Sequence, residues 1–263
     1  MIRNNIPKAK LKQGQIVIGS GVTQLRSTHV PRLFALAGFD FIFIDMEHSA
    51  FTMETVAEMI LTARSVDIAP IVRVPNAEYT FVARVLDLGA QGVIVPRVNT
   101  PQQVEEIVSW VKYPPHGVRG ATMTYAQTEG QTIPPEQFID QIVDQTLLVI
   151  QIERKQALEN LDEMLSISGV DVAALGYLDL SVDLGIAGQI DHPRMVESIE
   201  SIIAACDRHG ISAGLIHPNM KVITHWAGRG MRFLSYSTGA NLLLEAATDA
   251  VRQLRTNDNK GST

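Results

Sequence analysis

The feature of this sequence that most constrains its fold is the alternation of short apolar runs with helical patterns along nearly the whole chain. Most of the runs are continuously apolar and rich in β-branched residues, which is typical of parallel strands covered on both faces. The intervening segments carry apolar residues every three to four positions, as helices with one buried face do. We expect strands at 16–20, 41–45, 69–73, 92–96, 147–152, 171–175, 212–215 and 232–236.

A strand followed by a helix, repeated about eight times, predicts a (β/α)₈ or TIM barrel, and barrels of about 250 residues are single domains. The prediction therefore assigns residues 1–263 to one barrel domain. A doubly wound open sheet is the alternative, because one wrongly assigned strand would leave the two folds indistinguishable from the sequence. Two ends look loose, namely an N-terminal arm (1–14, Lys-rich from Pro7 to Gly14) and a polar tail at 256–263. The Pro-containing segment 111–130 predicts a long ordered loop near a barrel mouth, and long loops of this kind are often functional.

Charge and composition exclude several functions. The chain has 22 basic and 28 acidic residues, a net charge of −6 and no basic run, so we expect neither nucleic acid nor an anionic membrane as partner. No apolar stretch approaches the roughly 18 residues that span a bilayer. The N-terminus lacks the apolar core of a signal peptide, which favours a cytoplasmic location. The single cysteine, Cys206, excludes an intramolecular disulfide and a multi-cysteine metal site.

In a barrel of this kind the active site lies at the C-terminal ends of the strands, where the sequence places a set of polar residues. Buried charges at such a position require partners, a ligand or a metal. The candidates that follow the predicted strands are Asp45, Glu47, His48, Arg73, Gln151, Glu153, Tyr177, Leu178, Asp179, His217 and the loop 235–239.

Two carboxylates stand out among these candidates. Glu153 and Asp179 follow adjacent strands, and a pair of oxygen ligands completed by water suits Mg²⁺ or Mn²⁺. The alternative is structural: Glu153 pairs with Arg154 or Lys155, and Asp179 caps a short helix.

Three further residues have both a functional and a structural interpretation. Arg73 could stabilise a carboxylate or an enolate oxygen, or form an ion pair with Asp45 or Glu47. His48 could be a general base near neutral pH, or a hydrogen-bonded loop histidine. Asp87 lies on a helix away from the strand ends: an ion pair with Arg84 one turn earlier would explain it, and it could reach a neighbouring subunit's active site only in an oligomer.

Two other chemistries receive weaker support. Lys155 could form a Schiff base only if burial lowered its pKa, and its polar neighbours argue for exposure to solvent. The small-residue loop 235–239 precedes a helix where barrels often bind phosphate, but many turns into a helix look similar.

Six segments, in this order and over nearly the whole chain, resemble the HpcH/HpaI aldolase family, metal-dependent class II pyruvate aldolases such as 4-hydroxy-2-oxoheptanedioate aldolase. They are Gly38-Phe39-Asp40 with Ile44-Asp45-Met46-Glu47-His48, Val72-Arg73-Val74-Pro75, Leu86-Asp87-Leu88-Gly89-Ala90-Gln91-Gly92, Tyr113-Pro114-Pro115-His116-Gly117-Val118-Arg119-Gly120, Gln151-Ile152-Glu153 and Asp179-Leu180-Ser181.

The resemblance implies a TIM barrel of the phosphoenolpyruvate/pyruvate superfamily and a role for each matched residue. Glu153 and Asp179 would hold Mg²⁺, Mn²⁺ or Co²⁺, and Gln151 with the backbone near Leu178 and Asp179 would bind pyruvate. Arg73 would stabilise the enolate, His48 would accept a proton, and Asp87 would raise the basicity of His48. Asp45 would belong to the same hydrogen-bond network. Because family members are commonly hexamers, the resemblance also implies a homo-oligomer, a hexamer or a trimer, in which Asp87 acts across a subunit contact.

The resemblance implies reversible retro-aldol cleavage of a 4-hydroxy-2-oxo acid to pyruvate and an aldehyde. The alternatives are an oxaloacetate decarboxylase or another pyruvate-enolate lyase at the same site, and a non-enzymatic binding or scaffolding barrel. The sequence departs from the family pattern in two places. Tyr177 replaces a usual proline and His217 replaces a small residue, so we expect both to affect the choice of aldehyde.

Overall fold

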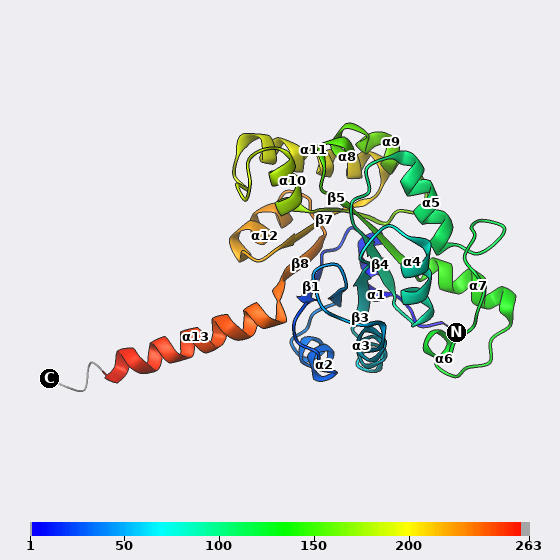
Figure 1. The fold of residues 1–263 in the computed structure, drawn as a ribbon, viewed down its shortest axis with the longest axis horizontal. Coiled ribbons are helices and arrows are strands. Elements are labelled where there is room, and N and C mark those ends of the chain that lie inside the picture. Colours follow the sequence, from blue (N-terminus) through cyan, green and yellow to red (C-terminus); the bar gives the residue numbers. More distant parts are fainter. Residues whose placement is uncertain (1, 259–263) are drawn as a thin grey trace.

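The strands form a closed barrel in the computed structural model, which describes residues 2–258. Each strand pairs in parallel with the next along the chain, and the last pairs with the first. The barrel prediction is therefore confirmed and the open-sheet alternative is wrong (Figure 1). The strands are β1 (Val17–Val22), β2 (Phe41–Asp45), β3 (Ala69–Arg73), β4 (Gly92–Val95), β5 (Leu147–Ile152), β6 (Val172–Leu175), β7 (Ser212–His217) and β8 (Phe233–Thr238).

Helices surround the barrel, and local sequence signals set several of their ends. Thr100 and Gln103 form a capping box at the start of α5, and Gly210 ends α11 in the left-handed conformation. The outer helices are α2 (His29–Leu36), α3 (Met53–Ser65), α4 (Tyr79–Asp87), α5 (Pro101–Val111), α7 (Pro135–Asp144), α9 (Leu161–Leu165), α11 (Pro193–His209) and α12 (Met220–Ala227). The short helices α6 (Tyr125–Thr128), α8 (Lys155–Glu159) and α10 (Tyr177–Asp183) lie in the connections.

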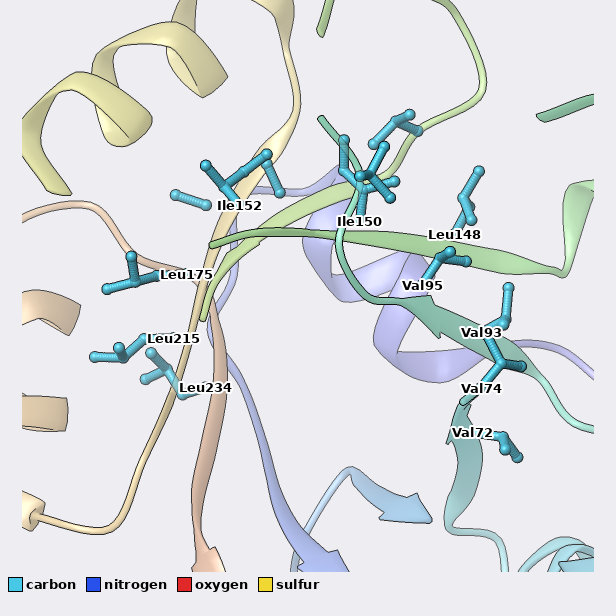
Figure 2. Close-up of a cluster of buried hydrophobic side chains, with 14 of the residues drawn as sticks. Val72, Val74, Val93, Val95, Leu148, Ile150, Ile152, Leu175, Leu215 and Leu234 are labelled. Carbon is cyan, nitrogen blue, oxygen red and sulfur yellow. The ribbon is translucent and has the colours of Figure 1, made fainter. Parts of the chain in front are cut away.

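Apolar side chains fill both sides of the barrel wall because successive residues of a strand point to opposite faces. Inside the barrel, the rings of Phe41 and Phe233 stack with centroids 4.4 Å apart and belong to one buried cluster. A larger cluster lies between the strands and the helices, and Figure 2 shows part of it on β3 to β8. Burial on both faces explains why the strands read as continuous apolar runs.

The N-terminal residues close one end of the barrel. Helix α1 (Ile6–Lys12) places Leu11 in the interior cluster. Nζ of Lys8 contacts Asp171 at 3.0 Å, Nζ of Lys10 contacts Asp40 at 2.5 Å, and Nδ2 of Asn5 donates to the carbonyl of Gln91 at 2.7 Å. These partners directly precede strands, so α1 covers the N-terminal end. The prediction of a loose arm from Pro7 to Gly14 is wrong.

The segment after α5 also lies at this N-terminal end. The hydroxyl of Thr124 donates to the carbonyl of Asp87 at 2.7 Å, and Arg64, near the end of α3, contacts Glu129 at 3.0 Å. Since α3, α4 and α5 run back from the C-terminal ends of the strands, a loop beside their ends lies opposite the functional mouth. The segment predicted as a long ordered loop near a barrel mouth therefore lies at the N-terminal end of the barrel, not at the end that carries the predicted site.

The last helix, α13 (Gly239–Asp258), projects away from the barrel (Figure 1). It exposes Leu243, Leu244 and Leu254, and α2 exposes Leu33 and Leu36. The predicted polar tail begins inside this helix, and its residues 259–263 lie outside the described part of the chain. Across residues 2–258, no helix combines the length and apolarity needed to cross a membrane.

Candidate active site

A cavity of about 270 Å³ opens at the C-terminal ends of the strands and collects most of the predicted site residues. Its lining comes from the ends of β2, β3, β5, β6, β7 and β8, as expected for a barrel enzyme. The predicted residues that line it are His48, Arg73, Gln151, Glu153, Leu178 and Asp179, together with the two departures Tyr177 and His217.

Arg73, the last residue of β3, is held in a fixed position by two acids. Its Nε and Nη2 donate to the two carboxylate oxygens of Asp45 at 2.9 and 2.7 Å, and its Nε lies 3.3 Å from Oε2 of Glu47. Burial opposes the charged guanidinium, but the hydrogen bonds and charges of Asp45 and Glu47 outweigh it and raise the pKa of Arg73. Nη1, the nitrogen that does not contact Asp45, donates to Oε1 of Gln151 at 3.4 Å, and both residues line the cavity.

Asp45 also shapes the loop that carries the histidine. Its Oδ1 accepts the backbone N–H groups of Glu47 at 3.0 Å and His48 at 3.3 Å. The side chain of His48 is 62% exposed at the rim, and its Nε2 lies 3.8 Å from Oε2 of Glu47. Asp45 thus positions both Arg73 and the turn before His48, although it does not line the cavity.

Glu153 is the buried charge of the site, with a relative exposure of 3%. Its Oε1 accepts the backbone N–H of Arg97 at 2.6 Å, and its Oε2 accepts Nε2 of Gln151 at 3.2 Å. Gly176 makes room for it, because a Cβ at that position would lie 2.4 Å from Oε2. Burial raises the pKa of Glu153 to about 7, and the charges of Glu47 and Asp179 add to the effect.

Arg97 is a site residue that the sequence reasoning missed. Besides its backbone bond to Glu153, its guanidinium pairs with Glu47 and donates to Oδ1 of Asn76 at 2.6 Å. It adopts a φ of +55°, which is uncommon for a residue with a side chain. Arg97 follows β4, and the candidates predicted from the sequence include no residue at the C-terminal end of β1 or β4. That position is the signal that could have found it.

Asp179 lies in the first turn of α10 with its side chain 47% exposed, 3.6 Å from Nη2 of Arg154. The backbone N–H groups of Leu178 and Asp179 lie in the first turn of α10, where the helix itself has no carbonyl group to accept their hydrogen bonds. Arg154 pairs with Asp179 and not with Glu153. Among the described residues, the alternative pairing of Glu153 with Arg154 or Lys155 is therefore absent.

The residues fit a hard divalent cation. No group of three or more His, Cys, Asp or Glu residues suited to a metal occurs within residues 2–258. Mg²⁺, however, is commonly held by one or two carboxylates, with substrate and water completing its shell. A buried carboxylate whose pKa is raised beside a second carboxylate matches that need, since a cation would offset the repulsion.

The part of the cavity wall formed by Tyr177, His217 and Ser237 is neutral. The rings of Tyr177 and His217 pack with centroids 4.5 Å apart, and the backbone N–H of Asn219 donates to Nδ1 of His217 at 3.0 Å. Burial lowers the pKa of His217. Ser237 completes this wall with a φ of +55°. The structure thus places both departures from the family pattern at the cavity.

Two residues considered in the sequence lie outside the cavity. Asp87 ends α4 and pairs with Nη2 of Arg119 at 2.7 Å, so the expected ion pair with Arg84 is replaced by one with Arg119. It lines a separate pocket between α3 and α4 with Met53 and Glu54. Lys155 is exposed at the start of α8, which removes the support for a Schiff base.

Comparison with known proteins agrees with this geometry. The family model described as HpcH/HpaI aldolase/citrate lyase matches residues 24–246. The chain belongs to the HpcH/HpaI aldolase/citrate lyase family. Membership makes it an enzyme of the aldolase type, a carbon–carbon lyase.

Relatives in the HpcH/HpaI family cover almost all of the chain. A hydroxypyruvate/pyruvate aldolase of Roseobacter denitrificans is 32% identical over 91% of this chain and 93% of its own length. A 4-hydroxy-2-oxo-heptane-1,7-dioate aldolase of Escherichia coli is 31% identical over 91% of both chains. The crystal structure of an HpcH/HpaI aldolase from Desulfitobacterium hafniense superposes with a TM-score of 0.89 at 30% identity, covering 94% of this chain and 96% of the other.

Proposed function

We propose that this chain is a divalent-metal-dependent aldolase that reversibly cleaves a 4-hydroxy-2-oxo acid to pyruvate and an aldehyde. The observation that supports it most is the position of Glu153. A carboxylate with 3% exposure and a pKa raised to about 7 lies in one cavity with Asp179, Arg73 and Gln151. Relatives named 4-hydroxy-2-oxo-heptane-1,7-dioate aldolase and 4-hydroxy-4-methyl-2-oxoglutarate aldolase are 31% and 32% identical to this chain.

Glu153 and Asp179 are the residues that would hold the cation, Mg²⁺, Mn²⁺ or Co²⁺. When bound, the cation supplies Lewis-acid chemistry at the keto group of the substrate. Exposure of Asp179 leaves room for substrate and water beside it.

Arg73, Gln151 and the first turn of α10 would bind the 2-oxo acid end. The backbone N–H groups of Leu178 and Asp179 and the amide of Gln151 supply neutral donors for the carboxylate. Arg73 supplies positive charge where the enolate oxygen develops, and its ion pairs with Asp45 and Glu47 hold it there before substrate binds. Removal of one such donor commonly costs about 10²–10³ in rate.

His48 would accept the proton of the 4-hydroxyl group. As that proton leaves, the C3–C4 bond breaks, the aldehyde carbonyl forms at C4, and the bonding electron pair passes to the enolate of pyruvate. A proton then returns to C3 and completes pyruvate. The exposed position of His48 at the rim lets it exchange this proton with water.

We also propose a homo-oligomer, a hexamer or a trimer, in which Asp87 of one subunit raises the basicity of His48 in another. Two features of the chain support self-association. The helix α13 projects from the barrel with exposed leucines, and α2 exposes Leu33 and Leu36 beside the barrel wall. Exposed apolar surface of this kind is typical of a protein interface. Sedimentation analysis tests it: Leu243→Glu/Leu254→Glu should shift the oligomer towards monomer.

Removal of metal tests the proposed reaction. Dialysis against EDTA should abolish cleavage of a 4-hydroxy-2-oxo acid, and Mn²⁺ or Mg²⁺ should restore it. Exchange of the C3 protons of pyruvate with deuterium, followed by NMR, reports formation of the enolate without any aldehyde. Full activity in EDTA would contradict the metal-dependent mechanism, and release of CO₂ from oxaloacetate without aldol turnover would favour a decarboxylase instead.

A further inference from the structure

The cavity has a neutral wall, formed by the ends of β7 and β8, that includes a buried polar atom without a hydrogen-bond partner. His217 and Ser237 line this wall and each has a relative exposure of 6%. Oγ of Ser237 has no hydrogen-bond partner, and Nδ1 of His217 accepts a hydrogen bond from the backbone N–H of Asn219. In the described part of the chain, one of the residues that line the substrate cavity, Ser237, therefore has a buried polar atom that is unsatisfied. Buried polar groups normally find a partner, so such groups at a cavity indicate a ligand.

The backbone fixes which nitrogen of His217 is free to donate. Because Nδ1 accepts the N–H of Asn219, the neutral ring carries its proton on Nε2. Packing of the ring against Tyr177 holds its orientation. His217 thus offers a neutral N–H donor from a rigid position in the cavity wall.

Ser237 is maintained in an unfavourable backbone conformation. Its φ of +55° lies in the left-handed region, where glycine is normally found. Strain of this kind concentrates at binding and catalytic sites, where surrounding structure enforces it. The Ser237 hydroxyl can rotate and can both donate and accept a hydrogen bond.

We propose that His217 and Ser237 form a subsite that hydrogen-bonds the hydroxyl group of a short hydroxyaldehyde, the aldehyde partner of the aldol reaction. The inference rests on the proposed function, in which Arg73, Gln151 and Glu153 take the pyruvate end of the same cavity. An oxygen of the ligand accepts from Nε2–H of His217, and its proton is donated to Oγ of Ser237.

The charge of this wall favours a hydroxyl over a carboxylate or a phosphate. An anion that is removed from water needs a cationic partner or several hydrogen-bond donors. The cavity-lining residues of the β7–β8 side are Ile216, His217, Pro218, Ser237, Thr238 and Asn241, which include no lysine or arginine. A volume of about 270 Å³ also limits the aldehyde to a few carbon atoms once pyruvate is bound.

A matched pair of aldehydes tests the subsite directly. Glycolaldehyde and propionaldehyde have the same size, and only the first has a hydroxyl where the second has a methyl group. With pyruvate and Mn²⁺, we expect kcat/KM for glycolaldehyde to exceed that for propionaldehyde by about tenfold or more, because the analogue leaves buried polar groups unpaired.

Variants assign that preference to the two residues. Ser237→Gly suits the positive φ and removes the hydroxyl, while Ser237→Ala removes it at some conformational cost. His217→Phe keeps a ring against Tyr177 and removes the donor. Each should lower the ratio of the two kcat/KM values by roughly 3- to 10-fold. Ser235→Ala is the matched control, because Ser235 is a buried, unpartnered serine of β8 that does not line the cavity.

The outcomes separate this inference from the proposed function. A preference for glycolaldehyde that Ser237→Gly and His217→Phe reduce and Ser235→Ala keeps would support the subsite. Normal exchange of the pyruvate protons with equal use of both aldehydes, or a ratio that survives in Ser237→Gly and His217→Phe, would overturn the subsite alone. Absence of both exchange and aldol turnover would overturn the proposed function and the subsite with it.

Discussion

The two ends of the barrel carry networks of arginine and carboxylate side chains that behave in opposite ways. At the N-terminal end, Arg3 and Arg64 contact Glu129, and the hydrogen bond from Arg3 together with the charge of Arg64 lowers the pKa of Glu129. At the C-terminal end, Arg73 contacts Asp45 and Glu47, yet burial raises the pKa of Glu153 to about 7.

The difference is one of charge balance. The N-terminal network pairs each of its acids with an arginine, and even the cavity of about 480 Å³ beside it is lined by cations that already have partners, such as Lys10 with Asp40. At the other end, Arg73 and Arg97 are engaged by Asp45 and Glu47, and Glu153 has only N–H donors. A closed network stabilises the fold, whereas a surplus carboxylate provides a place for a cation.

The largest expected effect comes from removing that surplus charge. Glu153→Gln keeps the shape of the side chain and can still accept the N–H of Arg97, but it removes a proposed metal ligand. We expect kcat/KM to fall at least about 100-fold, the upper range for residues that support a metal site. Glu159→Gln, on the exposed surface of α8, is the control and should match the wild type. Activity within a few-fold of the wild type would contradict the assignment of Glu153.

Asp45→Asn should have the next largest effect, because it removes the charge that holds Arg73 with two hydrogen bonds. We expect a fall in kcat/KM of about 10- to 100-fold, typical of residues that orient a catalytic group. Steady-state kinetics should show the loss mainly in kcat, since Arg73 acts on the enolate oxygen. A change confined to KM would show that Asp45 supports only substrate binding.

The raised pKa of Glu153 also makes a prediction about stability without metal. Its folded form keeps a proton that the unfolded chain releases above about 4.5, so the metal-free protein should lose stability as pH rises from 4.5 through 7. At pH 8, metal-free Glu153→Gln should be more stable than the wild type by about 1–3 kcal/mol, and the gap should close near pH 4.5. Urea unfolding at several pH values measures it. A wild type that gains stability across this range would refute the raised pKa.

The N-terminal network should respond in the opposite sense and more weakly. The pKa of Glu129 is lowered, so its contribution is present above the ordinary value of 4.5 and lost as pH falls through the folded pKa. At pH 7, Glu129→Gln should cost up to about 1 kcal/mol, the range of partly exposed ion pairs, and leave kcat/KM unchanged. Glu105→Gln, an exposed acid on α5, should cost less. Lost activity at wild-type stability would show that the two networks are coupled.

Much of the fold could be predicted because burial on both faces makes each strand a continuous apolar run. Predicted and observed strand ends differ by two residues or fewer. Helix α1 was missed because its lysines suggested solvent, whereas Lys8 and Lys10 reach acids at the strand starts. The end of the barrel at which the segment 111–130 lies could not be predicted, because its composition does not say at which end the preceding helix leaves it.

The candidate site could be predicted where one side chain carries the chemistry and follows a strand, as with Glu153 and Arg73. The contact of Arg97 with Glu153 could not be predicted, because it is made by a backbone N–H group, which any residue except proline can supply. The pairing of Asp87 with Arg119 joins residues 32 positions apart, which no local spacing rule reveals. Roles that depend on a second subunit stay predictions.

Helix α1 has a consequence for the path by which substrate and products reach the site. With Leu11 inserted among the interior side chains, α1 covers the N-terminal end of the barrel, and the cavity that holds Glu153 opens at the C-terminal end. Glu153 lies deep there, while Leu178 is exposed at the rim. In the proposed reaction, the substrate enters and both products leave through this same opening, so a product that stays bound blocks the entry of the next substrate molecule.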